Sequence, residues 1–169
     1  MLYRAFGRLW QQTGGGFRML QLESGQDTAA LKQHIHDEFP EMEEAVTWQT
    51  PFQKTEYYQI LQNADLVFDN LLLPLMSGNG IETLMSGHAA LVNKRIPEAL
   101  MLRFFPEMWP VLAVEDEDDI LAASKTALDN PAACQSLAQK GQAWILEHHG
   151  HEAIVQRNLQ AYQHVHPLP

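Results

Sequence analysis

The chain has 169 residues, which is the size of one ordinary domain, and its composition is apolar enough for a packed core. Its formal net charge of −10 argues against nucleic acid or an anionic membrane as the main partner. A single cysteine, Cys134, excludes an internal disulfide, and no apolar stretch is long enough to cross a membrane, so we expect a cytoplasmic protein.

The first third of the sequence alternates helical and strand patterns. Apolar residues recur at helical spacing between Leu2 and Trp10, and the glycines at 14–16 end this predicted helix. Further elements are predicted at 17–22 (strand), 28–37 (helix), 45–49 (strand) and 54–63 (helix). In the last of these helices, Tyr57 and Tyr58 are expected on the buried face, and stacking on a base is the alternative.

The central stretch predicts a strand, a glycine loop, a short helix and a second strand. The first strand, 65–69, is apolar and ends in an acid and an amide. Gly78-Asn79-Gly80 follows as a loop whose residues accept unusual dihedrals, and Glu82 is expected in the first turn of the helix. Gly87 ends that helix in the left-handed conformation, and 89–93 forms the next strand.

The last third continues the alternation and ends in helices. An irregular or briefly helical segment at 95–106 precedes a strand at 110–114. The acids at 115–119 resemble a cation site, but capping and the helix dipole explain them better, because a helix is predicted from 120 to 128. Two more helices are predicted at 131–147 and 152–165.

Three histidines near the C-terminus invite a metal interpretation. His148, His149 and His151 flank Gly150, but neighbouring helical residues point in different directions. A polar break between two helices is therefore preferred, and no metal site is predicted.

Strands that alternate with helices indicate a mostly parallel sheet covered on both faces. We therefore predict one α/β domain over residues 1–169, a Rossmann-like three-layer fold with a sheet of about five strands and C-terminal helices. Such sheets bind ligands at the carboxyl edge of their strands, which is where the loop at 78–80 is expected.

The central stretch resembles the donor-binding segment of GT-B glycosyltransferases of the group 1, sucrose-synthase-like class. In that family an "aDv" strand leads to a glycine loop and then to "EAMa.G.P.v", a pattern that the run from Ile81 to Ala90 follows. Ala64-Asp65 stands where the family strand begins. The C-terminal run from His148 to Tyr162 is similar to the end of GT-B donor domains.

The resemblance implies a transferase that uses a nucleotide sugar as donor substrate and needs no cofactor. The donor-binding residues would be Gly78, Asn79, Gly80, Ile81 and Glu82. The backbone N–H groups of Asn79, Gly80 and Ile81 would hold the diphosphate, as helix N-termini do, and Glu82 would bind the ribose hydroxyls. A weaker match places Ser24 and Gly25 near the donor. No catalytic residue is identified.

The resemblance also implies partners. The family's C-terminal domain normally starts one strand earlier and works with an N-terminal acceptor-binding domain, so we expect this chain alone to bind donor without transferring sugar. A homodimer is expected through the exposed face of the last helix, with Tyr162 and Val165, or through the cleft edge near Gly78 to Glu82. The alternative is a non-catalytic Rossmann-like binding or regulatory module, because Pro74 stands where the family has a second Glu.

Overall fold

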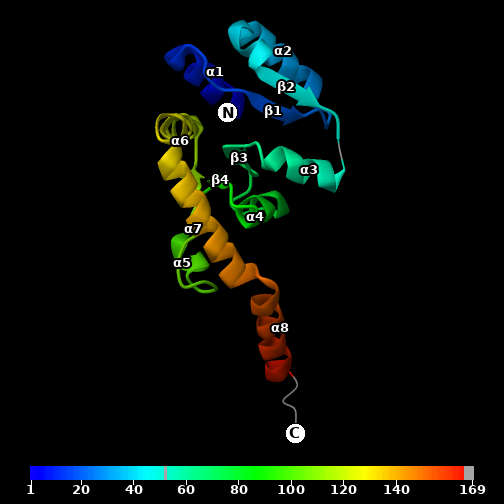
Figure 1. Cartoon of the computed structure of the whole chain (residues 1–169), viewed down its shortest axis with the longest axis vertical. Coiled ribbons are helices and arrows are strands. Elements are labelled where there is room, and N and C mark those ends of the chain that lie inside the picture. Colours follow the sequence, from blue (N-terminus) through cyan, green and yellow to red (C-terminus); the bar gives the residue numbers. More distant parts are fainter. Residues whose placement is uncertain (52, 166–169) are drawn as a thin grey trace. The chain divides into compact units, whose positions relative to one another are not determined.

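A computed structural model describes residues 1–51 and 53–165 of the chain. It is an α/β protein whose strands pair in parallel, with helices at its C-terminal end (Figure 1). The chain forms two compact units. Unit 1 comprises residues 1–63 and 115–129, and unit 2 comprises 64–114 and the chain from 130 onward.

Unit 1 contains the first two strands and most of the early helices. Its elements are α1 (Leu2–Thr13), β1 (Met19–Leu22), α2 (Thr28–Glu38), η1 (Pro40–Ala45), β2 (Val46–Gln49), α3 (Lys54–Leu61) and α6 (Glu117–Asp129). β1 and β2 pair in parallel, with Met19 opposite Val46 and Leu22 opposite Gln49. The predicted helix stop is confirmed, because Gly14 adopts a left-handed φ of 67° after α1.

The core of unit 1 includes the buried face of α1. Phe6 and Leu9 of this helix are buried, as the helical spacing predicts. Tyr3 is also buried, and burial raises the pKa of its phenol to about 12. The protonated hydroxyl donates a hydrogen bond of 2.6 Å to Oε1 of Gln21 on β1. This bond satisfies the phenol hydroxyl in a largely apolar surrounding.

Unit 2 contains the second sheet and the C-terminal helices. Its elements are β3 (Leu66–Phe68), α4 (Gly78–Met85), β4 (Ala89–Asn93), α5 (Glu98–Met101), β5 (Leu112–Val114), α7 (Pro131–His149) and α8 (His151–Val165). The strand order is β3-β4-β5 and every pair is parallel. Central strand β4 is buried along its whole length, as expected for a parallel strand.

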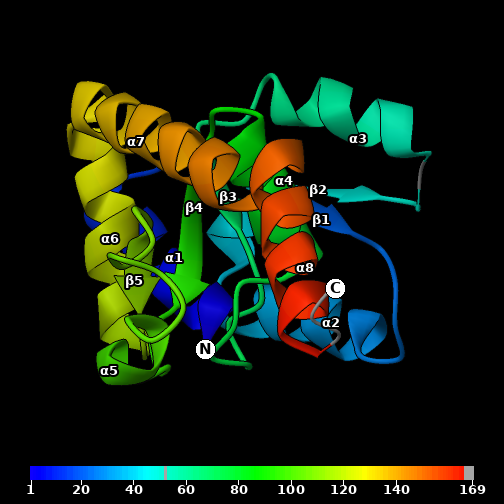
Figure 2. The same ribbon diagram turned by 90° about the horizontal axis from the view of Figure 1, so that it is seen from below.

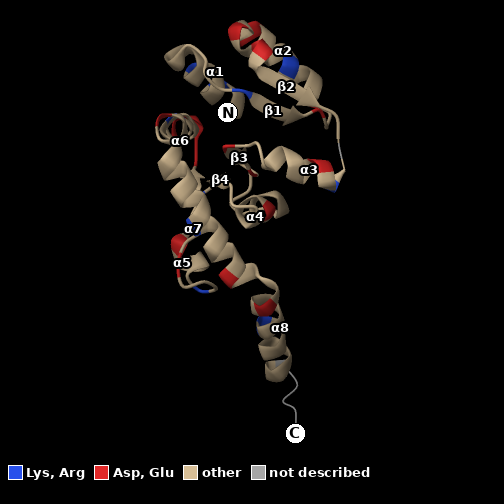
Figure 3. Cartoon of the chain, in the orientation of Figure 1, with Lys and Arg blue, Asp and Glu red and all other residues tan. Residues whose placement is uncertain are grey.

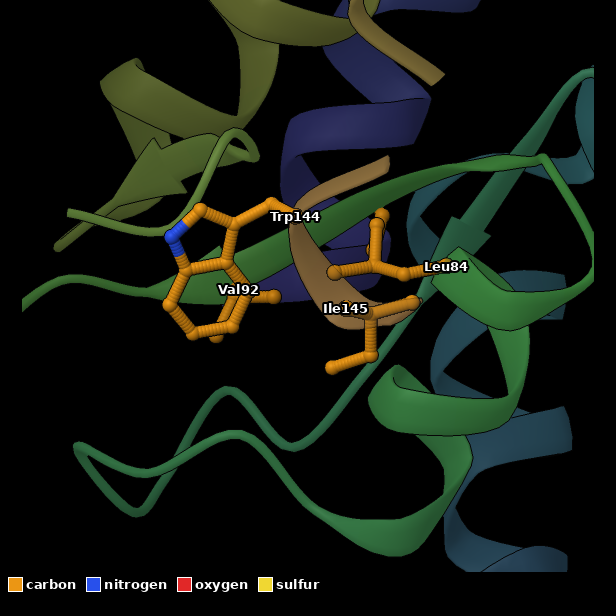
Figure 4. Close-up of a cluster of buried hydrophobic side chains, with 5 residues drawn as sticks. Leu84, Val92, Trp144 and Ile145 are labelled. Carbon is orange, nitrogen blue, oxygen red and sulfur yellow. The ribbon is translucent and has the colours of Figure 1, made fainter. Parts of the chain in front are cut away.

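The core of unit 2 forms where α4 and α7 pack side by side against β4 (Figure 2). Its central side chains come from all three elements: Leu84, Ala90, Val92, Trp144 and Ile145 (Figure 4). The two helices approach closely at Gly141 of α7. A Cβ at Gly141 would lie 2.7 Å from Cδ2 of Leu84 and 3.2 Å from the carbonyl oxygen of Pro110, so a larger residue would force this buried packing to shift.

The strands form two sheets in place of the single sheet of about five strands that the alternation predicts. All five predicted strands are present and their parallel pairing is confirmed, but they pair as β1-β2 and as β3-β4-β5. Helical crossovers require that consecutive strands run parallel, but they leave the choice of neighbours open. Hydrogen-bonded order depends on tertiary packing, which the local pattern does not contain.

Three further predictions concern the helices, and the structure confirms only part of them. The short helix expected within 95–106 is confirmed as α5. The helix expected from residue 120 begins earlier, at Glu117. Tyr58 of α3 is 42% exposed, so its predicted place on a buried face is wrong, and Tyr57 is only half-buried. Lys54 lies over both tyrosine rings, which stabilises this exposed arrangement.

Candidate functional site at the start of α4

The candidate site lies where the chain passes from β3 into α4, at the carboxyl edge of the unit 2 sheet. Asp69 follows β3 directly, and its N–H donates to the carbonyl of Leu91 over 3.0 Å, which continues the strand pairing. The Asp69 side chain is only 8% exposed. A buried carboxylate requires hydrogen bonds, and Asp69 receives them from Ser77.

Ser77 connects this carboxylate to the helix. Its backbone N–H donates to Oδ2 of Asp69 over 2.7 Å, and its hydroxyl donates to Oδ1 of the same carboxylate. The Ser77 hydroxyl oxygen also accepts a bond of 3.1 Å from the N–H of Asn79 and caps α4. Asp69 therefore fixes the N-terminus of α4 through Ser77.

Gly80 is needed here for close packing. A Cβ at this position would lie 2.6 Å from Oδ2 of Asp69 and 2.6 Å from Cγ of Met76. The expectation that Gly78-Asn79-Gly80 forms a loop with unusual dihedrals is wrong, because all three residues lie inside α4 and neither glycine has a positive φ. Glycine is required at 80 because a buried carboxylate approaches the helix backbone.

The position of Glu82 also differs from the sequence prediction. Ser77 caps the helix, so Glu82 is its fifth residue and lies in the second turn. The prediction placed it in the first turn because the sequence indicated a later helix start. In the second turn the helix dipole acts weakly on a carboxylate. Glu82 is half-buried on α4, four residues beyond the first helical residue, Gly78.

Two of the backbone N–H groups expected to bind an anion already donate hydrogen bonds within the protein. Asn79 donates to the Ser77 hydroxyl, and the N–H of Ile81 donates to the Ser77 carbonyl over 3.1 Å. The Asp69 carboxylate also places a negative charge beside this N-terminus. Helix N-termini favour anions, and at the start of α4 the Asp69 carboxylate of the protein itself lies beside the N-terminus.

Amide side chains shape the loop between β3 and α4. Asn93, buried at the end of β4, donates from Nδ2 to the carbonyl of Leu71 over 2.7 Å. The Oδ1 atom of Asn70 accepts from the N–H groups of Leu72 and Leu73. The loop is therefore held at both of its ends, by the Asn93 contact and by the Asp69–Ser77 contact.

The far end of α4 closes as predicted. Gly87 has a φ of 78°, and its N–H donates to the carbonyl of Leu84. The N–H of His88 donates to the carbonyl of Thr83. These two bonds form the Schellman pattern of a helix C-terminus. Gln142 of α7 adds a bond of 2.9 Å to the carbonyl of Met85. Both ends of α4 are therefore held by side chains or turns.

The other predicted donor residues, Ser24 and Gly25, belong to unit 1. They form the turn before α2, in which Gly25 has a φ of 96° and the Thr28 hydroxyl donates to both of their carbonyls. The five residues from Gly78 to Glu82 lie together on α4 in unit 2.

The histidine cluster has a structural explanation. His149 ends α7 and its ring packs 5.4 Å from Phe105 and 5.7 Å from Trp144, measured between ring centroids. Burial, followed by the charges of Arg157 and His148, lowers the pKa of His149. Gly150 separates α7 from α8, which confirms the predicted break between two helices. Within 1–51 and 53–165, no group of three or more His, Cys, Asp or Glu is placed to hold a metal ion.

Two further groups that could carry chemistry are the Cys134 thiol and the acidic run at the start of α6. Burial and the nearby Asp65 raise the pKa of the Cys134 thiol, which lies 3.7 Å from the carbonyl of Asp65. A protonated thiol is a poor nucleophile. Asp116 and Asp119 accept N–H bonds at the start of α6, so the capping explanation of the acidic run is confirmed. The described helices include none long and apolar enough to cross a membrane.

Sequence reasoning missed the residues that organise this site: Asp69, Ser77 and Asn93. Each of them had a visible signal. Asp69 and Asn93 are polar residues at the ends of apolar strands, and Ser77 directly precedes the helix as an N-cap residue does. Comparison with protein-family models finds no family that matches this chain, and comparison with curated proteins finds no match.

Proposed function

We propose that this chain is the nucleotide-sugar donor-binding part of a glycosyltransferase. The observation that supports this is the arrangement of β3, α4 and β4: α4 begins at the carboxyl edge of parallel strands, and the family-like run from Ile81 to Ala90 lies on α4 and β4. In open α/β sheets that edge is the usual ligand position.

In this proposal the backbone of α4 and the side chain of Glu82 bind different parts of the donor nucleotide. The start of α4 faces the diphosphate, and the Glu82 carboxylate accepts hydrogen bonds from the two ribose hydroxyls. A helix N-terminus would stabilise the charge that develops on the leaving diphosphate. Transfer also needs an acceptor-binding partner domain, so the chain by itself binds donor and does not turn it over.

Calorimetry with uridine, guanosine and adenosine diphosphates tests donor binding, and a Glu82→Gln variant tests the site. We expect weak binding of one diphosphate and a loss of about ten- to a hundredfold in affinity in the variant, because a charge-assisted bond is replaced. The melting temperature of the same variant is the control. An unchanged affinity with a lowered melting temperature would remove Glu82 from the site.

The second candidate function is a non-catalytic binding or regulatory module, and one observation favours it. The buried Asp69 carboxylate lies beside the start of α4 and repels a diphosphate there. No heat with any of the three diphosphates would favour this module over the transferase.

Self-association through α8 is a further part of the proposal. Ile154, Leu159 and Tyr162 on this helix are exposed, and the side chain of Val165 lies outside the described residues. A continuous apolar helix face is suited to pairing with a second copy. Light scattering over a range of concentrations tests this, and a monomer throughout would contradict it.

A further inference from the structure

A cluster of four rings joins the end of α7 to the core of unit 2. It consists of Phe105, Trp144, His148 and His149, which we call the ring cluster. Phe105 and Trp144 lie 5.1 Å apart between ring centroids, and the His148 ring lies 4.6 Å from that of Trp144. His149 packs against both Phe105 and Trp144. Trp144 is 2% exposed and is part of the unit 2 core (Figure 4), so the ring cluster anchors the last turn of α7.

Arg157 connects α8 to the ring cluster. Its Nη2 atom donates to the carbonyl of His148 over 2.7 Å, and its guanidinium lies 5.5 Å from the centroid of the Phe105 ring. Both positions favour a cation, one at the C-terminus of α7 and the other on an aromatic face. The side chains of 151–164 are all exposed, except that of Ala153, which is half-buried. The position of α8 therefore depends mainly on the contacts at its junction with α7.

A single residue, Gly150, separates the two helices. Its backbone is extended, with φ −62° and ψ 160°, and its N–H donates to the carbonyl of Leu146 over 3.0 Å. A Cβ at this position would overlap the Leu146 carbonyl oxygen, so glycine permits the close approach. Rotation about the two dihedrals of one residue redirects a helix without unfolding it, as in other hinges. The α7–α8 junction thus has the construction of a hinge, which the ring cluster and Arg157 hold in one position.

The charges around His149 favour its neutral form. The titratable and charged side chains of the three segments that meet here are those of Glu147 and His148 of α7, His151, Glu152 and Arg157 of α8, and Arg103 and Glu107 on either side of Phe105. The charged side chains of α8 lie in its first half, next to the junction (Figure 3). The three acids in this set are exposed, so water screens their attraction for a protonated His149. Burial, followed by the positive charges of Arg157 and His148, lowers the pKa of the His149 ring.

We propose that the α7–α8 junction is an acid-sensitive hinge, in which a proton taken up by His149 opens the ring cluster and lets α8 turn about Gly150. A protonated ring needs water, and it gains that water by leaving Phe105 and Trp144. Repulsion between the new cation and Arg157 acts in the same direction, because the two belong to different helices. Arg157 already occupies the C-terminus of α7, so a second cation there gains little from the helix dipole.

The direction of the pH effect differs between two histidines of this chain. A base whose pKa is lowered by packing stabilises that packing above its ordinary pKa of about 6.5, and the stabilisation falls as the pH decreases below this value. His36 of unit 1 is the opposite case, since a hydrogen bond to Glu43 raises its pKa and protonation strengthens their ion pair. Mild acid therefore weakens the α7–α8 junction while it strengthens the His36 contact. The hinge needs no bound nucleotide, so it stands or fails apart from the transferase proposal.

Nuclear magnetic resonance of the full chain tests the proposal over a range from about pH 7.5 to about pH 4.5, at a concentration where light scattering shows a monomer. The ring signals of His149 give its titration midpoint, which we expect below about 6.5. Nuclear Overhauser contacts between Arg157 and Phe105, and between His149 and Trp144, should weaken at least about threefold across that midpoint. The Cα chemical shifts of 151–164 should stay helical, because α8 turns without unfolding.

Two matched variants test the role of His149. His149→Phe keeps a ring in the cluster but cannot take up a proton, so the contact between Arg157 and Phe105 should persist over the whole pH range. His151→Phe is the control, because it removes an exposed histidine from the start of α8, and its pH response should equal that of the wild type. Circular dichroism of each variant confirms that it is folded.

Three results would overturn the proposal. One is that both contacts of the wild-type chain are unchanged over the whole pH range. Another is that His149→Phe loses the contact between Arg157 and Phe105 with the same midpoint as the wild type. The third is a His149 midpoint at or above about 6.5, because the packed ring cluster would then favour the protonated ring. The first and third results need only the wild-type chain, so the test does not depend on the folding of a variant.

Discussion

Helices α4 and α6 each follow a parallel strand in the sequence, and each has carboxylates at its N-terminus. The source and the burial of those carboxylates differ. At α4 the carboxylate is Asp69, which comes from the strand end and is buried. At α6 the carboxylates come from the helix itself and the residues before it. There Arg4 and Arg8 of α1 form ion pairs with Glu117, and Arg8 also pairs with Asp118.

The difference shows how burial changes what a carboxylate does for a helix. The acids at the start of α6 are exposed or half-buried, so each contributes modestly and salt screens them. The single carboxylate at α4 is buried, and its bonds to Ser77 hold the loop that leads into the helix. The four predictions that follow test this contrast, from the largest expected effect to the smallest.

Gly80→Ala should destabilise the protein most, by about 3 kcal/mol. The new methyl would lie 2.6 Å from Oδ2 of Asp69, and the hydrogen bonds from Ser77 prevent that carboxylate from moving away. Gly78→Ala is the matched control in the same helix, because its Cβ would meet nothing within 4 Å. Urea unfolding of both variants measures the effect, and equal stabilities would contradict the close approach at Gly80.

Asp69→Asn should cost about 2 kcal/mol, because the variant keeps the shape of the side chain but loses charge-assisted bonds to Ser77. Chemical denaturation measures this loss. The same variant should bind a nucleoside diphosphate more tightly than the wild type, because it removes the internal negative charge at the start of α4. A weaker affinity in a folded variant would contradict our view of Asp69 as an internal anion.

Asp116→Ala should cost about 1 kcal/mol, the usual effect of losing an N-cap side chain. Its Oδ1 atom accepts a bond of 2.9 Å from the N–H of Asp119 at the start of α6. Thermal unfolding compares this variant with Asp116→Asn, which preserves the acceptor oxygen and should stay close to wild type. A loss as large as that of Asp69→Asn would remove the distinction between buried and solvated caps.

Arg8→Met should have the smallest effect, a decrease in Tm of about 1 °C that disappears in high salt. Bonds to Asp118 and Glu117 raise the pKa of the Arg8 guanidinium, but the side chain is 41% exposed, so solvent screens these ion pairs. Methionine keeps the apolar stem and removes only the charge. Scanning calorimetry at two salt concentrations checks this, and a large decrease that salt does not alter would show a role in packing.

Local patterns predicted much of the fold, and the misses have physical causes. The helix stop at Gly14, the Schellman turn at Gly87 and the five strands followed from residue types whose backbone preferences act within a few residues. The start of α4 was misplaced because two glycines within three residues, Gly78 and Gly80, normally weaken a helix. Packing against Asp69 and the cap from Ser77 override that preference here.

In the candidate site, too, local patterns predict some features and long-range packing decides the others. The residues from Gly78 to Glu82 are predicted as a site from the sequence because a strand, two closely spaced glycines and a helix pattern occur together. The contact between Asp69 and Ser77 spans eight residues, and that between Asn93 and Leu71 spans 22. No periodic pattern reports contacts at such separations, so the sequence marks each of these residues locally but only the coordinates show which residues they contact.

The sequence by itself determined the class of the protein, an α/β chain of parallel strands, because hydrophobic period and turn residues act locally. It also marked α4 as the helix most suited to a ligand. Only the tertiary structure decided that the strands form two sheets and that Tyr58 is exposed. It also decided that a buried carboxylate meets the start of α4. These outcomes depend on which segments pack together, and the free energy of that packing is shared among residues far apart in the chain.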